Sequence, residues 1–157
     1  IDPSGLVTVA GGKWTTYRHM AEDAVNQAAT IARLPERDCV TKQLNIHGYL
    51  QHADKFGHLQ VYGTDAMQIQ QLENNQIHPA LPYTAGEIKW GVREEMVQTV
   101  EDALARRTRA LFLNAKAAME MAPAVATILR RELGATEMWE RQQVDAFCTL
   151  AKSYLPS

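Results

Sequence analysis

Apolar residues recur at helical spacing along most of the chain. Between residues 15 and 34, the spacing of apolar positions such as Ala28 and Ile31 predicts one helix. Pro35 ends the pattern, because a proline disfavours the helical conformation of the residue before it. Residues 5–10 form a short run with valine and threonine that predicts one β-strand. A lone strand is not stable, so this one is expected to need a pairing partner.

A change of pattern between residues 35 and 48 divides the chain. Residues 39–46 predict an extended segment, and Gly48 closes it. We therefore expect a strand–Gly-Gly–helix region over 1–34, a linker over 35–48 and an all-helical domain over 49–157.

The first part of the helical domain is predicted to contain two short helices. They cover residues 50–60 and 64–73, and Thr64 or Asp65 is expected to cap the second. Residues 74–82 predict a loop, because two prolines within four positions oppose regular pairing. Nothing after Gly12 alternates convincingly as a sheet.

Two capping patterns start the next helices. Thr84 and Glu87 form a Thr-x-x-Glu capping box, and Thr99 and Asp102 form a similar start for a short helix. The buried stripe expected for the first of these helices consists of Ile88, Val92, Met96 and Val97.

The C-terminal third predicts long helices. Residues 111–133 are expected in one or two pieces, with Asn114 or Pro123 as the break and Gly134 as the stop. Thr136 starts the last helix, whose expected inward residues are Met138, Val144, Phe147, Cys148 and Leu150. The fold class is therefore mainly α, an irregular multi-helix domain preceded by a short strand and helix.

The composition excludes several classes of function. The 157 residues are 46% hydrophobic and 22% charged, which is typical of a soluble globular protein. A net charge of −2 offers no positive field, so no nucleic-acid partner is expected. No run approaches the roughly 18 consecutive apolar residues that a membrane-spanning helix needs.

Residue types that bind metals show no ligand pattern. Cys39 and Cys148 lie far apart and are expected to be buried thiols in a reduced cytosolic setting. The tryptophans are expected in the core or at a domain interface. The scattered histidines predict no metal site: His19, His47, His52, His58 and His78.

A glycine pair before the first helix is the strongest candidate for a binding site. Glycines allow a ligand to approach the backbone closely, and the free amides of the following helical turn favour an anion. Lys13 and Arg18 add positive charge, and threonine hydroxyls stand where N-caps occur. A glycine pair alone also occurs in plain tight turns. The predicted binding residues are Gly11, Gly12, Lys13, Trp14, Thr15 and Thr16.

Longer strings carry a resemblance. Residues 11–18, Gly-Gly-Lys-Trp-Thr-Thr-Tyr-Arg, resemble the last flavin-contacting segment of the FAD-dependent glycerol-3-phosphate dehydrogenases. Residues 83–95, and residues 99–109 with their Thr-Val-Glu-Asp and Arg-Arg-Thr-Arg strings, resemble the signature of that family's helical C-terminal domain. The matches run in order from residue 5 to about residue 134, and residues 35–80 are the least diagnostic.

The resemblance implies that the chain is part of a larger protein. Family members hold the FAD pyrophosphate with a Gly-x-Gly-x-x-Gly turn near their N-terminus. The nine glycines here do not make that spacing, and the chain starts Ile1-Asp2-Pro3-Ser4 without a methionine. Residues 1–34 would then be the remnant of the FAD domain, whose sheet would pair with strand 5–10.

For the intact protein, the resemblance implies oxidation of sn-glycerol 3-phosphate to dihydroxyacetone phosphate, with electrons passing through FAD to quinone. Lys13 would assist the flavin or hold the substrate phosphate. The fragment is expected to be inactive and not to bind FAD, with no catalytic residue assigned in it. The implied location is cytoplasmic, and any membrane contact would be peripheral, on the cytoplasmic face of the inner membrane. A homo-oligomer is left open.

Other interpretations remain beside this one. Arg106, Arg107 and Arg109 could bind a phosphate, but preceding acidic residues favour ion pairs on helix faces. Arg107 is expected as a buried structural partner of Glu101 or Glu95. A non-catalytic helical interaction or regulatory module is the alternative function, and an independent phosphate-binding domain is a third.

Overall fold

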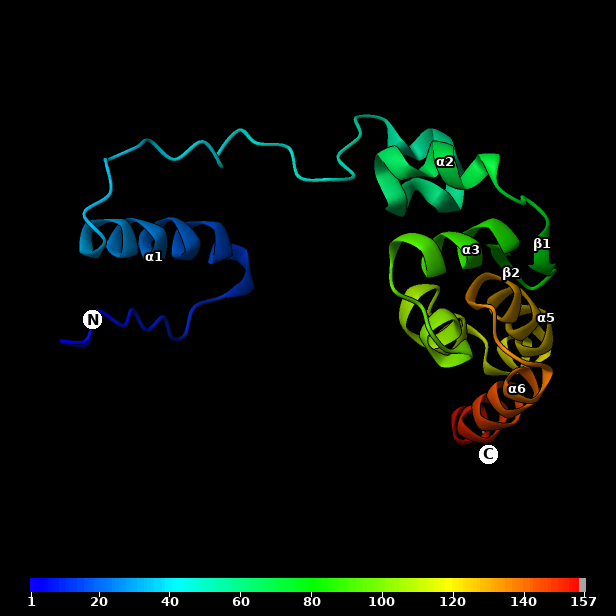
Figure 1. Ribbon diagram of the computed structural model, residues 1–157. Coiled ribbons are helices and arrows are strands. Elements are labelled where there is room, and N and C mark those ends of the chain that lie inside the picture. The colour runs from blue at the N-terminus through cyan, green and yellow to red at the C-terminus, as the bar shows by residue number, and fades with distance from the viewer. Residues whose placement is uncertain (156–157) are drawn as a thin grey trace. The chain divides into compact units, whose positions relative to one another are not determined.

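The computed structural model describes residues 1–155 and separates the chain into two compact units (Figure 1). Unit 1 is Ile1–His47 and unit 2 is Gly48–Ser157. The described residues are mostly helical, with one small two-stranded antiparallel sheet. The predicted mainly α fold class is confirmed.

Unit 1 consists of one helix and extended segments. A 3₁₀ turn, η1 (Trp14–Thr16), leads into helix α1 (Tyr17–Ile31). Residues 5–10 do not form the predicted strand. Among the described residues no strand lies beside them, and Leu6 and Val9 are exposed. The strand prediction therefore fails for this chain, since a strand forms only when it has a partner.

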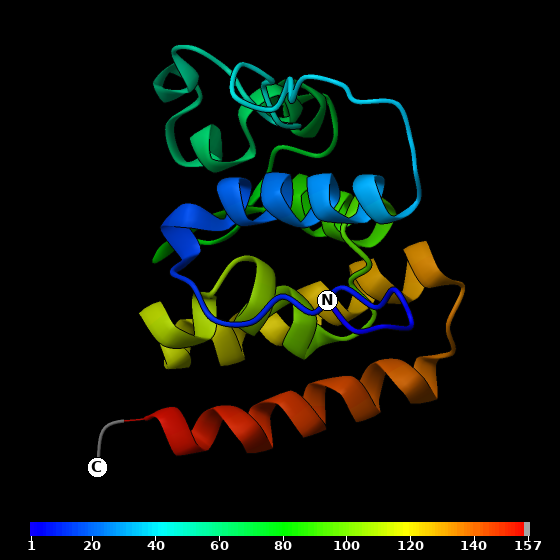
Figure 2. The same cartoon turned by 90° about the vertical axis from the view of Figure 1, so that its left-hand side faces the viewer.

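Unit 2 contains the remaining elements. In chain order they are η2 (Ala53–Asp65), α2 (Ala66–Gln71), β1 (Gln76–His78), β2 (Leu81–Thr84), α3 (Ala85–Glu94), the π-helical η3 (Asp102–Arg107), α4 (Ala110–Leu113), α5 (Ala115–Leu133), α6 (Glu137–Ala151) and η4 (Lys152–Tyr154). Helix α5 is central, because it packs against α3, α4 and α6 (Figure 2).

A continuous core fills unit 2. Its largest fully buried side chains along α5 are Met121, Val125 and Leu129, which repeat at the spacing of one helix face. Leu104 of η3 and Phe147 of α6 are also buried in this cluster. A smaller cluster of Leu59, Ala66 and Ile69 joins η2 to α2.

The helix starts predicted at Thr84, Thr99 and Thr136 are confirmed. The Thr84 hydroxyl accepts from the Glu87 amide, and the Glu87 carboxylate accepts from the Thr84 amide at 2.8 Å. Thr99 and Asp102 make the same reciprocal pair. The Thr136 hydroxyl accepts from the Trp139 amide at the start of α6.

The predicted break in the long C-terminal stretch falls at Asn114, and α5 continues through Pro123. The Asn114 side chain accepts from the Ala117 amide and caps α5. Gly134 ends the helix in the left-handed region at φ 67°, as predicted.

The prediction of a loop over residues 74–82 is wrong. Strands β1 and β2 pair as an antiparallel hairpin in which Gln76 faces Thr84 and His78 faces Leu81. Pro79 lies in the two-residue turn, and Pro82 lies where the pairing is irregular. A proline is tolerated at both kinds of position, because no amide is needed there for a ladder hydrogen bond.

The helix predicted over 50–60 is also wrong in type and extent. Residues 53–65 form 3₁₀ turns that Gly57 and Gly63 interrupt with non-helical backbone. Gly63 has φ 55°, and a Cβ there would lie 1.6 Å from the Gly48 carbonyl oxygen. Asp65 does stand at the N-cap of α2, although its side chain makes no capping hydrogen bond.

Two methionines placed in apolar stripes by the sequence are exposed. Met96 follows the end of α3 with a left-handed φ of 58°, and Met138 lies in the first turn of α6. Trp90 and Trp139 pack against the clusters as expected. Cys148 is only partly buried, and so is Cys39 in unit 1, so the expectation of two buried thiols is wrong.

Candidate functional site

The predicted binding residues of unit 1 form an open turn before α1. Gly11 and Gly12 both have positive φ, at 78° and 94°. A Cβ at Gly12 would lie 2.2 Å from the Met20 sulfur, whereas Gly11 has open space around it. The glycine pair therefore lets the chain enter the helix through a backbone path that other residues rarely adopt.

The turn leaves amides open at the helix start. The Thr16 amide donates to the Lys13 carbonyl at 2.9 Å, and the Tyr17 amide donates to the Trp14 carbonyl. The amides of Trp14 and Thr15 lie ahead of these bonds, where no preceding helical turn supplies an acceptor. Together with the positive end of the helix dipole, they suit a small negative group.

The threonines do not act as the predicted N-caps. The Thr16 hydroxyl donates to the Lys13 carbonyl at 2.9 Å and makes no capping bond. The Thr16 hydroxyl and the Thr16 amide both donate to the Lys13 carbonyl, and together they fix the backbone of the turn.

Lys13 and Trp14 are exposed within this chain. The Trp14 side chain is 85% exposed and stacks on Tyr17 with ring centroids 5.4 Å apart. Trp14 is therefore not a core residue here. Both side chains are free to contact a group that lies outside this chain.

Arg18 is committed elsewhere, which corrects its expected part in the anion site. Its guanidinium donates to the Glu22 carboxylate at 2.7 Å and to the Thr41 hydroxyl at 3.2 Å. Arg18 holds the pKa of Glu22 below its usual value. Of the predicted cations, Lys13 alone is left for a ligand among the described residues of this turn.

A second polar cluster, in unit 2, was missed by sequence reasoning. The Glu87 side chain is only 2% exposed, and its carboxylate lies 3.0 Å from the His58 ring nitrogen. Tyr62 also reaches Glu87, and burial with this carboxylate nearby raises the pKa of the Tyr62 hydroxyl. These contacts fasten η2 to α3. No local signal predicts them, since 29 positions separate His58 from Glu87.

Arg106 and Arg107 form ion pairs and hydrogen bonds with acidic residues that precede them in the chain. Arg106 pairs with Glu101 and Asp102 at 2.6 and 3.0 Å. Arg107 donates to the Glu95 carbonyl at 2.6 Å and lies 3.6 Å from the Glu95 carboxylate. Arg107 is thus a structural partner of Glu95, but it is partly exposed and not buried as predicted. Burial raises the pKa of Glu95 even though Arg107 opposes the shift.

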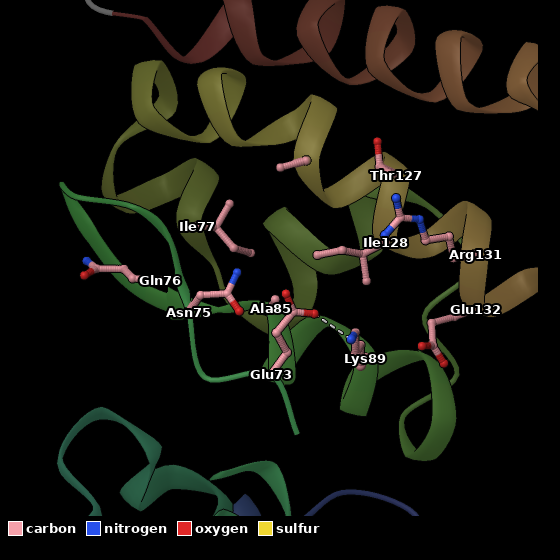
Figure 3. A pocket seen from close by; sticks show the side chains of 11 residues that line it. Glu73, Asn75, Gln76, Ile77, Ala85, Lys89, Thr127, Ile128, Arg131 and Glu132 are labelled. Atoms are coloured by element: carbon pink, nitrogen blue, oxygen red, sulfur yellow. Dashed lines mark hydrogen bonds and ion pairs between the residues drawn. The ribbon is translucent and has the colours of Figure 1, made fainter. Parts of the chain in front are cut away.

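A pocket of about 380 Å³ lies between β1, α3 and α5 (Figure 3). Its charged groups largely satisfy one another. Lys89 donates to Glu73 at 2.6 Å, as the dashed line in Figure 3 shows, and Glu132 accepts two hydrogen bonds from Arg93. Thr127 at its wall donates to Pro123 and Glu140. Most charged groups of the pocket are therefore already paired, and Arg131 is the lining cation that has no carboxylate within 4.0 Å among the described residues.

The described residues contain no cluster of three or more histidine, cysteine or acidic side chains that could hold a metal ion. His78 pairs with Glu120 at 2.8 Å, and His58 pairs with Glu87. No helix in residues 1–155 is both long enough and apolar enough to cross a membrane.

Comparison with known proteins assigns the chain to a family. A family model described as the C-terminal domain of alpha-glycerophosphate oxidase matches residues 7–143. The chain belongs to this family. The resemblance to the C-terminal portion of the FAD-dependent glycerol-3-phosphate dehydrogenases is thereby confirmed.

Individual relatives agree with the family assignment. The chain is 34% identical to a probable mitochondrial glycerol-3-phosphate dehydrogenase of Caenorhabditis elegans, over 92% of this chain and 24% of the relative. It is 32% identical to the mitochondrial glycerol-3-phosphate dehydrogenase of Rattus norvegicus, over 92% of this chain and 23% of that protein. The bovine enzyme of the same name is 31% identical and covers 99% of the chain.

The chain spans about a quarter of the length of these curated relatives. No solved structure matches it. The matched region of the alpha-glycerophosphate oxidase family includes the 11–16 turn and most of unit 2.

Proposed function

We propose that residues 1–157 form the C-terminal portion of a flavoprotein that oxidises sn-glycerol 3-phosphate to dihydroxyacetone phosphate and passes the electrons through FAD to a quinone. The match of the family model to residues 7–143 carries this proposal. The relatives support it, because they bear the name glycerol-3-phosphate dehydrogenase and align over nearly the whole chain. The longer polypeptide is called the parent protein below.

In the parent protein, the 11–16 turn would contact the flavin. A flavin that accepts a hydride gathers negative charge along its pyrimidine edge. The open amides of Trp14 and Thr15 and the positive end of the α1 dipole would stabilise that charge. Lys13, which is exposed and unpaired in this turn, would assist the flavin or hold the substrate phosphate.

The chain on its own is expected to neither retain FAD nor oxidise glycerol 3-phosphate. One turn with two open amides and one lysine contacts only a small part of a dinucleotide, and the pyrophosphate site would lie in the remainder of the parent protein. The named relatives are mitochondrial. For the parent protein, we propose a cytoplasmic location with peripheral contact, if any, to the cytoplasmic face of the inner membrane.

Absorption spectroscopy tests the function. The purified parent protein should show flavin bands that bleach when sn-glycerol 3-phosphate is added without oxygen, whereas the 157-residue chain should be colourless. A parent protein without flavin would refute the proposal and favour a helical interaction module. Stoichiometric FAD on the 157-residue chain would refute the assignment of the pyrophosphate site to the remainder.

Two substitutions in the parent protein separate the roles of the units. Lys13→Ala should lower kcat/KM by about 10²–10³ with an unchanged melting temperature, as removal of one electrostatic donor does. Arg107→Ala should lower the melting temperature more than it lowers kcat/KM, because Arg107 bonds the Glu95 carbonyl. Unchanged kinetics in Lys13→Ala would remove the proposed role of the turn.

A further inference from the structure

We infer that a groove beside α4 is the surface on which unit 2 docks the remainder of the parent protein. The α4 groove is formed by Phe112, Leu113, Lys116, Tyr154 and Leu155, and it has a volume of about 630 Å³. Figure 2 shows α4 and the C-terminal end of α6 at the same end of unit 2. This inference rests on the proposed function, because it assumes that a longer polypeptide surrounds the chain.

The groove exposes large apolar side chains beside buried core residues. Phe112 is 55% exposed and Leu113 is 66% exposed, although their neighbour Leu111 is buried in the core. The Tyr154 ring meets the Phe112 ring edge-on, with centroids 5.6 Å apart. A rigid aromatic pair beside exposed leucines is typical of the centre of a protein interface.

Unpaired positive charge surrounds these apolar residues. The Arg109 guanidinium lies 6.0 Å from the centre of the Phe112 ring, Lys116 lines the groove, and Lys152 precedes the groove residue Tyr154 by two positions in sequence. Within residues 1–155, none of these three cations has a carboxylate within 4.0 Å. In contrast, Arg106 and Arg107 close by are paired. The occupant is therefore expected to carry carboxylates as well as an apolar side chain.

The backbone at the groove is strained. Arg109 has φ 60°, a left-handed conformation that a side chain other than glycine rarely adopts. Such strain persists where surrounding contacts hold it, and it is concentrated at functional positions. Here it sets Arg109 over the exposed face of Phe112.

The charges and the shape favour the remainder of the parent protein over other occupants. A two-fold contact between two copies would place these cations against one another, which is repulsive. A flat lipid surface would leave the concave groove unfilled. Helix α4 has only four residues, which is too short for an amphipathic helix that inserts into a lipid surface. The chain covers about a quarter of its relatives, so most of each relative lies outside the matched region and is available as the occupant.

Lys116→Glu tests the inference, because it should change the melting temperature differently in the 157-residue chain and in the parent protein. Lys116 lies in the first turn of α5, where a negative side chain favours the helix dipole. The substitution should therefore leave the melting temperature of the 157-residue chain unchanged or slightly higher. In the parent protein it should lower the melting temperature by about 3 °C or more, because the acidic partner is then repelled.

Leu113→Asp is the apolar counterpart, and Met138→Asp is the matched control, because Met138 is equally exposed on α6. Leu113→Asp should destabilise the parent protein more than the 157-residue chain, whereas the control in the first turn of α6 should have the same small effect on both polypeptides. Equal effects of Leu113→Asp on the two polypeptides, or no effect of it on the parent protein, would overturn the docking surface.

A photo-crosslinking residue at position 113 of the parent protein identifies the occupant. The expected product is an internal crosslink to a carboxylate-bearing peptide that precedes residue 1. Crosslinks only to a second copy or to lipid would overturn the inference. Flavin absorbance of the same preparation is a separate readout. A flavin-free parent with the expected shifts refutes the dehydrogenase function alone, and an active flavoprotein without them refutes the docking surface alone.

Discussion

The two units of this chain contain helices of similar amphipathic pattern but use them differently. Helix α1 of unit 1 buries none of its fifteen residues, and Val25 on its apolar side is 65% exposed. Helix α5 of unit 2 buries residues along most of its length, from Ala115 to Leu129. A helical pattern therefore states which face a helix will bury, while the neighbouring elements decide whether burial takes place within the same chain.

The difference has a consequence for function. Unit 2 has its own core, reciprocal helix caps and ion pairs. Its described surface is therefore formed by contacts within the unit itself. Unit 1 contains the proposed flavin-contacting turn, and its large apolar side chains, such as Leu6, Val9 and Val25, are exposed. Under the proposed function, the remainder of the parent protein would cover them.

The largest expected effect separates the two units directly. Leu104→Ala in the core of unit 2 should lower the free energy of unfolding by about 3 kcal/mol, because it leaves a cavity among fully buried neighbours. Val25→Ala in unit 1 should change it by less than about 0.5 kcal/mol. Urea denaturation followed by circular dichroism measures both. Equal losses would mean that α1 shares a core with unit 2.

The buried Glu87 cluster should be the next most sensitive feature. Glu87→Ala removes the acceptor for the Thr84 amide and for His58, which should cost about 2–3 kcal/mol. Glu73→Ala is the control, since it removes only an exposed, solvent-screened ion pair with Lys89 and should cost much less than Glu87→Ala. Thermal melts of both variants would show whether the difference exists; a Glu87 loss no larger than the control would deny the cluster a structural role.

A smaller effect depends on pH. Arg93 holds the pKa of Glu132 below its usual value, so the folded carboxyl is more acidic than the unfolded one. The pair then stabilises unit 2 above the pKa of the unfolded glutamate, about 4.3, and this stabilisation is lost as the pH falls through the folded pKa. Glu132→Gln should cost up to about 1 kcal/mol at neutral pH and nothing in acid.

Glu95→Gln should show the reverse trend. Burial raises the pKa of Glu95, so its contribution favours the folded state at low pH and is lost as the pH rises through the folded pKa. The variant should therefore gain stability relative to the natural chain as the pH rises. Denaturation at several pH values distinguishes the two glutamates, and parallel curves for both variants would contradict the assigned directions.

Local signals allowed much of unit 2 to be predicted from the sequence. The caps at Thr84, Thr99 and Thr136 and the stop at Gly134 depend on residues within a few positions, and all four occur as predicted. The family resemblance was likewise carried by short strings of residues. These features need no knowledge of the tertiary structure.

Features that depend on distant partners could not be predicted in the same way. The 76–84 hairpin forms despite two prolines because each falls where no ladder bond is needed. His58 meets Glu87 only because η2 folds onto α3. The assignment of the 11–16 turn as a flavin site remains a prediction, since the flavin and the rest of its binding site would lie outside this chain.

The most direct test of the contrast between the units is the folding of residues 48–157 alone. This polypeptide should show a helical circular dichroism spectrum and a cooperative thermal transition with the same midpoint as the 157-residue chain, because its core and caps lie within it. A coil-like spectrum without a cooperative transition would contradict the account.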